Sequence, residues 1–189
     1  MFLVRLLLLV SIAGPSIAAP YFVQCYDFGC KSNQEIRFSE FQWDEIRANF
    51  NPGQDSDAEK QAIRQAIATM EKFSGEITGT SLDKGGNYPG YDIAKQMDCI
   101  DESTNTFQYL AALEELNLLN WHRVEPKIRR MVWFADHWTA VISEVEMGNR
   151  FAVDSWYRDN GELPYIQPLE DWKRKRDFPV NYNPELASR

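Results

Sequence analysis

The sequence predicts an α+β protein in which helices are followed by an antiparallel sheet. A helical period runs through "SDAEKQAIRQAIATMEKF", where apolar side chains recur on one face at Ile63, Ala66, Ile67 and Met70. A second helix is expected to begin at Cys99 within "KQMDCIDESTNTFQYL". Two later segments, "HWTAVISEV" and "RFAVDSW", have strand composition, and the turn "EMGNR" between them indicates a hairpin. Helices first and strands later are typical of the α+β class.

The first segment, "MFLVRLLLLVSIAGPSIAAP", has the layout of a secretory signal peptide. Arg5 supplies the positive charge, residues 6–9 the apolar centre, and Ala18 the small residue before a cut. We therefore expect a signal peptide over residues 1–18, one domain over residues 19–189, and an exported protein, periplasmic or secreted. The apolar run is shorter than the about 20 residues of a membrane span, so we expect no membrane span after cleavage.

The net negative charge of the chain limits the kinds of molecule that it is expected to bind. The net charge of −8 becomes −9 once Arg5 is removed with the leader. An acidic surface repels phosphate backbones and anionic lipids, which argues against nucleic acid or a membrane surface as the main partner. We expect a protein or peptide substrate instead, with the cell envelope as one source. Two separated histidines and a spare cysteine have no metal-ligand spacing, so neither a metal nor another cofactor is expected.

The cysteines single out one residue. In an oxidising compartment neighbouring cysteines tend to pair, and Cys25 and Cys30 lie in the short segment "CYDFGC". If they form a disulfide, Cys99 is left over, and an odd cysteine in an exported protein is a candidate reactive thiol. The competing pairing of Cys99 with Cys25 or Cys30 stays open at this point.

Before Cys99 the chain is expected to hold a strand, two helices and a long loop. Residues 20–52 should supply the strand and the first helix. The next helix should begin with a capping box between Ser56 and Glu59. The segment 74–97 is rich in glycine and turn formers, so it is predicted to be a loop, and loops of this length are often functional.

The helix that begins at Cys99 should continue to about residue 119. Its buried face is expected to carry four apolar residues: Phe107, Leu110, Ala111 and Leu113. Asp101 and Glu102 in the first turn favour the positive end of the helix, whereas the pair Asp98 and Asp101 opposes formation of a thiolate. A further short helix is expected near "PLEDWKRK".

Three residues form a candidate catalytic constellation. Proteins activate a thiol with a helix N-terminus and a nearby imidazole, and Cys99 has the first by position. His137 begins a strand, and a hairpin of this length sets Asp154 beside it. The carboxylate would then bind one ring nitrogen and leave the other facing the thiol. His122, in "NWHRVEP", is expected to be a half-exposed strand residue instead.

This order of elements resembles the transglutaminase-like branch of the papain-like fold. That branch includes transglutaminases, bacterial transglutaminase-like cysteine proteinases and peptide N-glycanases. The resemblance covers about residues 97–157 and rests on a cysteine at a helix start, "HW" at a strand start and "VDSW" in the next strand. It implies Cys99 as the nucleophile, His137 as the general base and then acid, and Asp154 as the residue that orients the imidazole.

The chemistry implied is acyl transfer from an amide or peptide. The thiolate attacks the carbonyl and leaves a thioester, which water hydrolyses or an amine captures. The backbone amide of Cys99 should stabilise the oxyanion, with Gln96 or a tyrosine of the preceding loop as a second donor. Trp138 and Trp156, with Trp133, are candidates to line a groove, although ordinary core packing is the favoured role for each of them.

Two other functions fit the same residues. A cell-wall peptidase of the NlpC/P60 type also opens a helix with "DC" and uses a strand histidine, but its third residue is usually polar rather than an aspartate this far downstream. The other alternative is a binding or scaffold protein that keeps the fold without catalysis.

Overall fold

The computed structural model describes residues 19–87, 93–132 and 135–174. The predicted signal peptide, residues 1–18, lies outside the described residues. The helices and strands follow in this order: β1 (Tyr21–Tyr26), β2 (Ser32–Arg37), α1 (Glu40–Arg47), α2 (Ser56–Thr78), α3 (Cys99–Glu115), β3 (His122–Val132), β4 (Ala135–Glu144), β5 (Arg150–Asp154), β6 (Tyr165–Pro168) and α4 (Leu169–Lys173). The α+β class is confirmed, with one addition: the expected first strand is a hairpin of β1 and β2.

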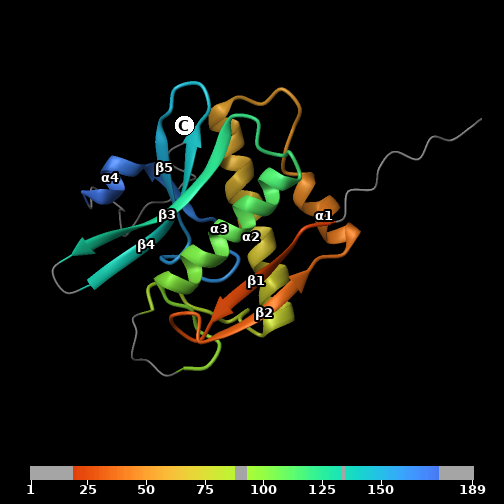
Figure 1. The fold of residues 1–189 in the computed structure, drawn as a ribbon. Coiled ribbons are helices and arrows are strands. Elements are labelled where there is room, and N and C mark those ends of the chain that lie inside the picture. The colour runs from red at the N-terminus through yellow and green to blue at the C-terminus, as the bar shows by residue number, and fades with distance from the viewer. Residues whose placement is uncertain (1–18, 88–92, 133–134, 175–189) are drawn as a thin grey trace, which may run out of the picture.

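Helix α3 occupies the centre of the molecule (Figure 1). It contacts β1 on one side, β3, β4 and β5 on another, and α2 along its length. The two antiparallel sheets therefore do not meet as layers, and each packs against α3 instead. The residue at the start of this helix, Cys99, lies where the helix, the β1–β2 hairpin and the four-stranded sheet come together.

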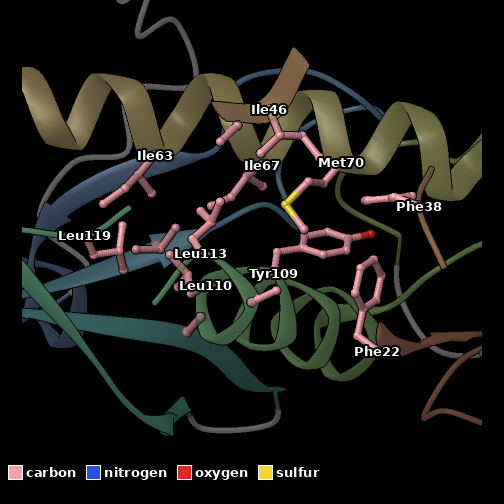
Figure 2. Packing of buried hydrophobic residues seen from close by; sticks show 14 of the residues in the cluster. Phe22, Phe38, Ile46, Ile63, Ile67, Met70, Tyr109, Leu110, Leu113 and Leu119 are labelled. Atoms are coloured by element: carbon pink, nitrogen blue, oxygen red, sulfur yellow. The ribbon is translucent and has the colours of Figure 1, made fainter. Parts of the chain in front are cut away.

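The main core fills the space between α2, α3 and the first hairpin (Figure 2). Ile63, Ile67 and Met70 of α2 are fully buried, as their helical period predicts. On α3 the predicted Leu110 and Leu113 are buried, and so is Tyr109, whose ring meets Phe22 edge to face at 5.1 Å. The face of α3 that packs here therefore includes an aromatic residue that its apolar pattern did not indicate.

The start and end of α2 differ from the prediction. Its N-cap is Asp55, whose side chain accepts a hydrogen bond from the Ala58 amide at 2.8 Å, so the capping box expected between Ser56 and Glu59 is absent. The helix also runs to Thr78, past the expected loop start at residue 74, and stops at Gly79. Glycine ends it because this position needs a left-handed backbone, with φ +82°, which is unfavourable for other residues.

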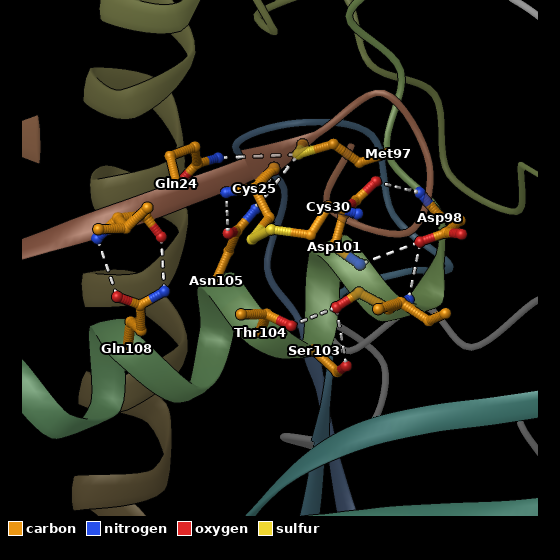
Figure 3. Close-up of a disulfide and its surroundings, with 12 residues drawn as sticks. Gln24, Cys25, Cys30, Met97, Asp98, Asp101, Ser103, Thr104, Asn105 and Gln108 are labelled. Carbon is orange, nitrogen blue, oxygen red and sulfur yellow. Dashed lines mark hydrogen bonds between the residues drawn. A yellow bond between two sulfur atoms is a disulfide. The ribbon is translucent and has the colours of Figure 1, made fainter. Parts of the chain in front are cut away.

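The polar side of α3 holds the first hairpin in place (Figure 3). Asn105 accepts from the Cys25 amide at 2.7 Å and donates to the Cys25 carbonyl at 2.9 Å. One turn later Gln108 makes the same pair of bonds with Val23, at 2.8 and 2.5 Å. The two side-chain amides thereby replace a neighbouring strand along the edge of β1, whose backbone groups would otherwise be unsatisfied.

The second sheet is a meander in the order β3-β4-β5-β6, as the predicted hairpin requires. Ala140 of β4 pairs with Val153 of β5, and Ser143 pairs with Arg150. Ala140 belongs to the main core, whereas Val141 belongs to a second cluster with α4. The middle of the sheet is therefore covered on both faces. No helix in the described part of the chain is long and apolar enough to cross a membrane.

A buried carboxylate joins α2 to the start of this sheet. Glu59 is fully buried and accepts hydrogen bonds from three consecutive backbone amides, those of Asn120, Trp121 and His122, at 2.8–3.0 Å. It also pairs with the His122 ring at 3.0 Å. The prediction of a half-exposed His122 is wrong, because this carboxylate satisfies the imidazole inside the protein.

We predict that Glu59→Gln lowers the free energy of unfolding by about 2–4 kcal/mol, because the amide presents donors to backbone N–H groups and leaves them unpaired. Glu76→Gln, on the exposed side of the same helix, should change it by less than about 0.5 kcal/mol. Denaturant unfolding followed by tryptophan fluorescence measures both. Equal stabilities for the two variants would contradict the role of Glu59.

Candidate active site

Cys99 is the first residue of α3 and carries a free thiol. The predicted disulfide between Cys25 and Cys30 is confirmed, so the competing pairings with Cys99 do not occur. Asp98 is the N-cap, and its carboxylate accepts from the amides of Ile100 at 2.9 Å and Asp101 at 3.0 Å. The amide of Cys99 is not used by the cap and points toward its own sulfur.

The sulfur lies beside the backbone of β4 on both sides of His137. Sγ approaches the carbonyl oxygen of Asp136 at 3.8 Å, and the Trp138 amide donates toward the sulfur. The helix start and the strand carrying His137 are thus in direct contact, although 38 residues separate Cys99 from His137 in the sequence.

His137 and Asp154 form the pair that the hairpin predicts. His137 Nε2 lies 2.6 Å from Asp154 Oδ2, and both side chains are buried. Extending the β4–β5 register by one residue places Asp154 opposite Thr139, and therefore on the same face as His137. The other ring nitrogen, Nδ1, is buried and has no hydrogen-bond partner among the described residues. It is the atom left to exchange a proton with a thiol or a substrate.

Trp172 of α4 is a member of the site that the sequence did not identify. Its indole Nε1 donates to the same Asp154 oxygen that binds His137, at 2.8 Å. The guanidinium of Arg130 stacks over the Trp172 ring at 4.4 Å and donates to its carbonyl oxygen. Asp154 is therefore held from two directions, and α4 is the element that supplies the second.

Aromatic rings enclose the imidazole. Trp156, Tyr157 and Trp172 have ring centroids 4.8, 5.2 and 5.6 Å from that of His137. Trp156 was predicted to line a groove, and it is buried against this histidine while donating to the Asn87 carbonyl at 2.9 Å. The rings restrict the imidazole to one orientation and exclude water from its bond with Asp154.

The surroundings of Cys99 disfavour its charged form. Burial raises the pKa of the thiol above its ordinary value, and the negative charges of Asp98 and Asp154 raise it further. Hydrogen bonds from the backbone amides of Trp138 and of Cys99 itself act in the opposite direction and do not compensate. The resting site therefore holds a neutral thiol next to an aspartate-bound imidazole.

The other predicted site residues have different positions. Gln96 bonds to the preceding loop: its side-chain amide nitrogen donates to Leu82 at 3.1 Å, and its oxygen accepts from Lys84 at 3.0 Å and Asn87 at 2.6 Å. Its role in an oxyanion site stays a prediction. Trp138 is half-buried on β4 directly after His137, whereas Trp133 lies outside the described residues.

The loop of the first hairpin braces the segment just before Cys99 (Figure 3). The Asp27 amide donates to the Gln96 carbonyl at 2.9 Å, and the Asp27 carboxylate accepts from the Lys95 amide at 2.6 Å. The Cys30 amide donates to Asp101 at 2.5 Å. Residues 27–30 are all in the left-handed conformation, with φ between 58° and 69°. Each non-glycine residue there costs about 1–2 kcal/mol, so the loop depends on the disulfide and these contacts.

A cluster of three buried carboxyl groups lies behind the first turns of α3. It consists of Glu71 of α2, Asp83 of the following loop and Glu102 of α3. Burial raises the pKa of Glu71 to about 8 and that of Asp83 to about 7, and together with the neighbouring acids it raises that of Glu102 well above its usual range. Burial and the neighbouring acids therefore disfavour the anionic form of Glu102 that was expected at the helix end.

One group of described residues has the spacing of metal ligands: Cys25, Cys30 and Asp101. Two of its three ligand atoms are the sulfurs of the disulfide, so they are not available to bind an ion. The carboxyl cluster does not meet this spacing.

The comparisons with known proteins supply no relative. No protein-family model, curated protein or solved structure matches the chain. The site therefore has to be interpreted from its own geometry, in which the Cys99 sulfur contacts the backbone on both sides of His137, and His137 is bonded to Asp154.

We predict that Asp98→Asn makes Cys99 react severalfold faster with iodoacetamide at pH 8. Asparagine caps a helix as well as aspartate does, but it lacks the negative charge that raises the thiol pKa. The matched control is Asp55→Asn, the same change at the N-cap of α2. A stopped-time alkylation series with mass detection gives both rates. An unchanged rate in Asp98→Asn would show that Asp98 does not influence the thiol.

We predict that the protein becomes less stable as the pH rises from about 4.5 to about 8. In this window the folded protein keeps protons on the carboxyl cluster that the unfolded chain releases, so unfolding is favoured by higher pH. Glu71→Gln should reduce the slope by up to about 1.4 kcal/mol per pH unit, the value for one proton. Glu115→Gln, on the exposed end of α3, should leave it unchanged. Unfolding free energies at five pH values test this, and a slope that survives Glu71→Gln would contradict it.

Proposed function

We propose that this protein is a cysteine-dependent acyl-transfer enzyme that uses Cys99, His137 and Asp154. The observation that carries the proposal is the His137–Asp154 bond of 2.6 Å beside a free thiol at a helix start. Isolated cysteines are often structural, but a structural cysteine has no need of a buried imidazole with one nitrogen bound by a carboxylate and the other unpartnered.

The proposal extends to the fold. A helix that begins with the nucleophile and packs against consecutive antiparallel strands carrying the histidine and the aspartate is the arrangement expected of a transglutaminase-like, papain-like domain. The contact of α3 with β4 and the β4–β5 pairing support this assignment.

The raised thiol pKa favours a general-base route rather than a preformed ion pair. In this route Cys99 Sγ attacks a carboxamide or peptide carbonyl while its proton passes to His137 Nδ1. The oxyanion accepts from the Cys99 amide, which the N-cap leaves free, and His137 then protonates the departing amine. Asp154 and Trp172 keep the imidazole in the required tautomer. Water or a second amine then attacks the thioester, giving hydrolysis or transfer.

Export is part of the proposal. The leader-like segment over residues 1–18 and the Cys25–Cys30 disulfide both favour an oxidising compartment, either the periplasm or the exterior. Peptides of the cell envelope are then among the available substrates.

One observation favours a second candidate, a binding protein on the same fold. The thiol pKa is raised rather than lowered, and no thiol–imidazole hydrogen bond joins Cys99 to the unpartnered nitrogen of His137. A site that has lost catalysis would keep the three residues as part of its packing.

We predict that wild type modifies members of a peptide pool and that Cys99→Ala abolishes this. The pool contains glutamine, asparagine, amidated and cell-wall stem peptides with an added primary amine, so mass spectrometry separates cleavage, deamidation and crosslinking. His137→Ala should lower the rate by about 10²–10⁴-fold, and Asp154→Asn should lower it as well, since each removes part of the proton-transfer path.

Asp57→Asn, an exposed residue of α2, is the control for loss of an aspartate, and circular dichroism checks that each variant is folded. Turnover that persists in folded Cys99→Ala would refute the catalytic assignment. Cleavage confined to stem peptides would favour a cell-wall peptidase over a transglutaminase-like activity. Binding of a pool member without conversion, equal in wild type and Cys99→Ala, would favour the second candidate.

A further inference from the structure

A lysine that the sequence did not single out lies at the candidate active site. Lys127 of β3 extends toward the first turns of α3, where its Nζ donates to Thr104 Oγ1 at 2.6 Å and approaches Ser103 Oγ at 3.5 Å. Its ammonium also lies 5.5 Å from the ring centre of Trp138, the residue after His137. The charge is close enough to interact with the Cys99 sulfur.

A break in the β3–β4 register gives Lys127 this position. Glu125 pairs with Val141, but the next pair along the strands is Ile128 with Thr139, so Pro126 and Lys127 together face the single residue Ala140. This is the geometry of a β-bulge, which changes the direction of side chains on the bulged strand. Pro126 suits the position because it has no amide proton to leave unpaired.

The two hydroxyl groups are oriented to accept from the ammonium. Ser103 Oγ donates its proton to the Ile100 carbonyl at 3.2 Å, and Thr104 Oγ1 donates to the same carbonyl at 2.6 Å. Their lone pairs therefore remain for Lys127. An ammonium has three donors, of which two are directed to these hydroxyls. Among the described residues no carboxylate lies within ion-pair distance of Lys127 Nζ.

The acidic groups around Lys127 act on its charge without a direct ion pair. Burial lowers the pKa of the lysine, while Cys99, Asp101 and Asp98 favour its charged form from a distance. Asp98 is occupied by the helix cap, and Asp101 is bonded to the hairpin loop. Since the thiol is neutral at rest, a half-buried cation at this position gains from any anion that enters the site.

We propose that Lys127 is the substrate-recognition residue of the Cys99 site and binds a carboxylate group of the amide or peptide substrate. The bound carboxylate takes the third donor of the ammonium, while Trp138 provides an apolar wall beneath it. An overall net charge of −8 would repel such a substrate, so this cation is what admits an acidic group next to the thiol. This inference rests on the proposed function for its substrate, but the anion site itself can be tested without turnover.

The test compares alkylation of Cys99 by iodoacetate and by iodoacetamide. The same thiolate attacks both reagents and displaces iodide, so the ratio of the two rate constants cancels the thiol pKa and reports the local preference for an anion. Cys99 is the one free thiol, which makes the reaction specific. The same ratio in urea-unfolded protein with the disulfide intact is the reference.

We expect the native ratio to exceed the unfolded ratio by about three- to tenfold, as a nearby unit charge requires. Lys127→Met, which keeps the aliphatic stem, should remove the preference, and Lys127→Arg should retain it. Lys60→Met is the matched control, because it removes a partly buried lysine of α2 that pairs with Asp57. A native ratio equal to the unfolded ratio, or a preference that survives Lys127→Met, would overturn the proposal.

A second measurement concerns the substrate. For peptide pairs that differ by aspartate against asparagine beside the reacting amide, Lys127→Met should raise KM for the acidic member alone and change kcat alike for both members. Equal losses for both members would overturn substrate recognition by Lys127. Absence of turnover combined with an intact iodoacetate preference would instead contradict the proposed function and leave the anion site standing.

Discussion

The structure depends on the way α3 satisfies the edge of β1. A strand edge leaves backbone groups without partners, and here Asn105 and Gln108 provide them from one face of a helix. The bonds set the rotation of α3 as well as its position, because two side chains one turn apart must meet two strand residues at once. That rotation directs Cys99 toward β4. The left-handed loop, closed by its disulfide, then holds Lys95 and Gln96, so the start of the helix is constrained from both sides.

Sequence patterns predicted those parts of the site that depend on local geometry. The register of a short hairpin follows from its turn, so Asp154 could be placed beside His137, and the segment that opens with Cys99 was correctly expected to be a helix. Contacts between elements that are far apart in the sequence could not be predicted, because they produce no pattern in the neighbouring residues. Trp172 reaches Asp154 from a helix that begins after β6, and Glu59 is directed to the backbone of residues 120–122 rather than to its own helix. The cap of α2 was misplaced by one residue because Asp55 and Ser56 are both good N-caps.

The electrostatics of the candidate site do not favour a resting thiolate. Burial, with the neighbouring acidic groups, raises the pKa values of Cys99 and Glu102 at the start of α3, and burial raises that of Asp83. Lys127 is the cation that opposes this trend, and a bulge in β3 brings it there. The reactivity of the Cys99 thiol would then depend on whether a ligand is bound. A ligand that displaces water and binds Lys127 changes the electric field at the sulfur. A neutral resting thiol is also less prone to oxidation than a thiolate.

The aromatic enclosure of His137 has an optical consequence. Two indole rings lie against the imidazole, with centroids 4.8 and 5.6 Å away, and a protonated imidazole is a cation held against them. Indole emission is sensitive to a positive charge at this range, so a change in the charge beside the two rings would change the intrinsic fluorescence. The same two tryptophans that pack against the histidine thus allow changes at the site to be followed by intrinsic fluorescence, without a dye, an isotope or a substrate.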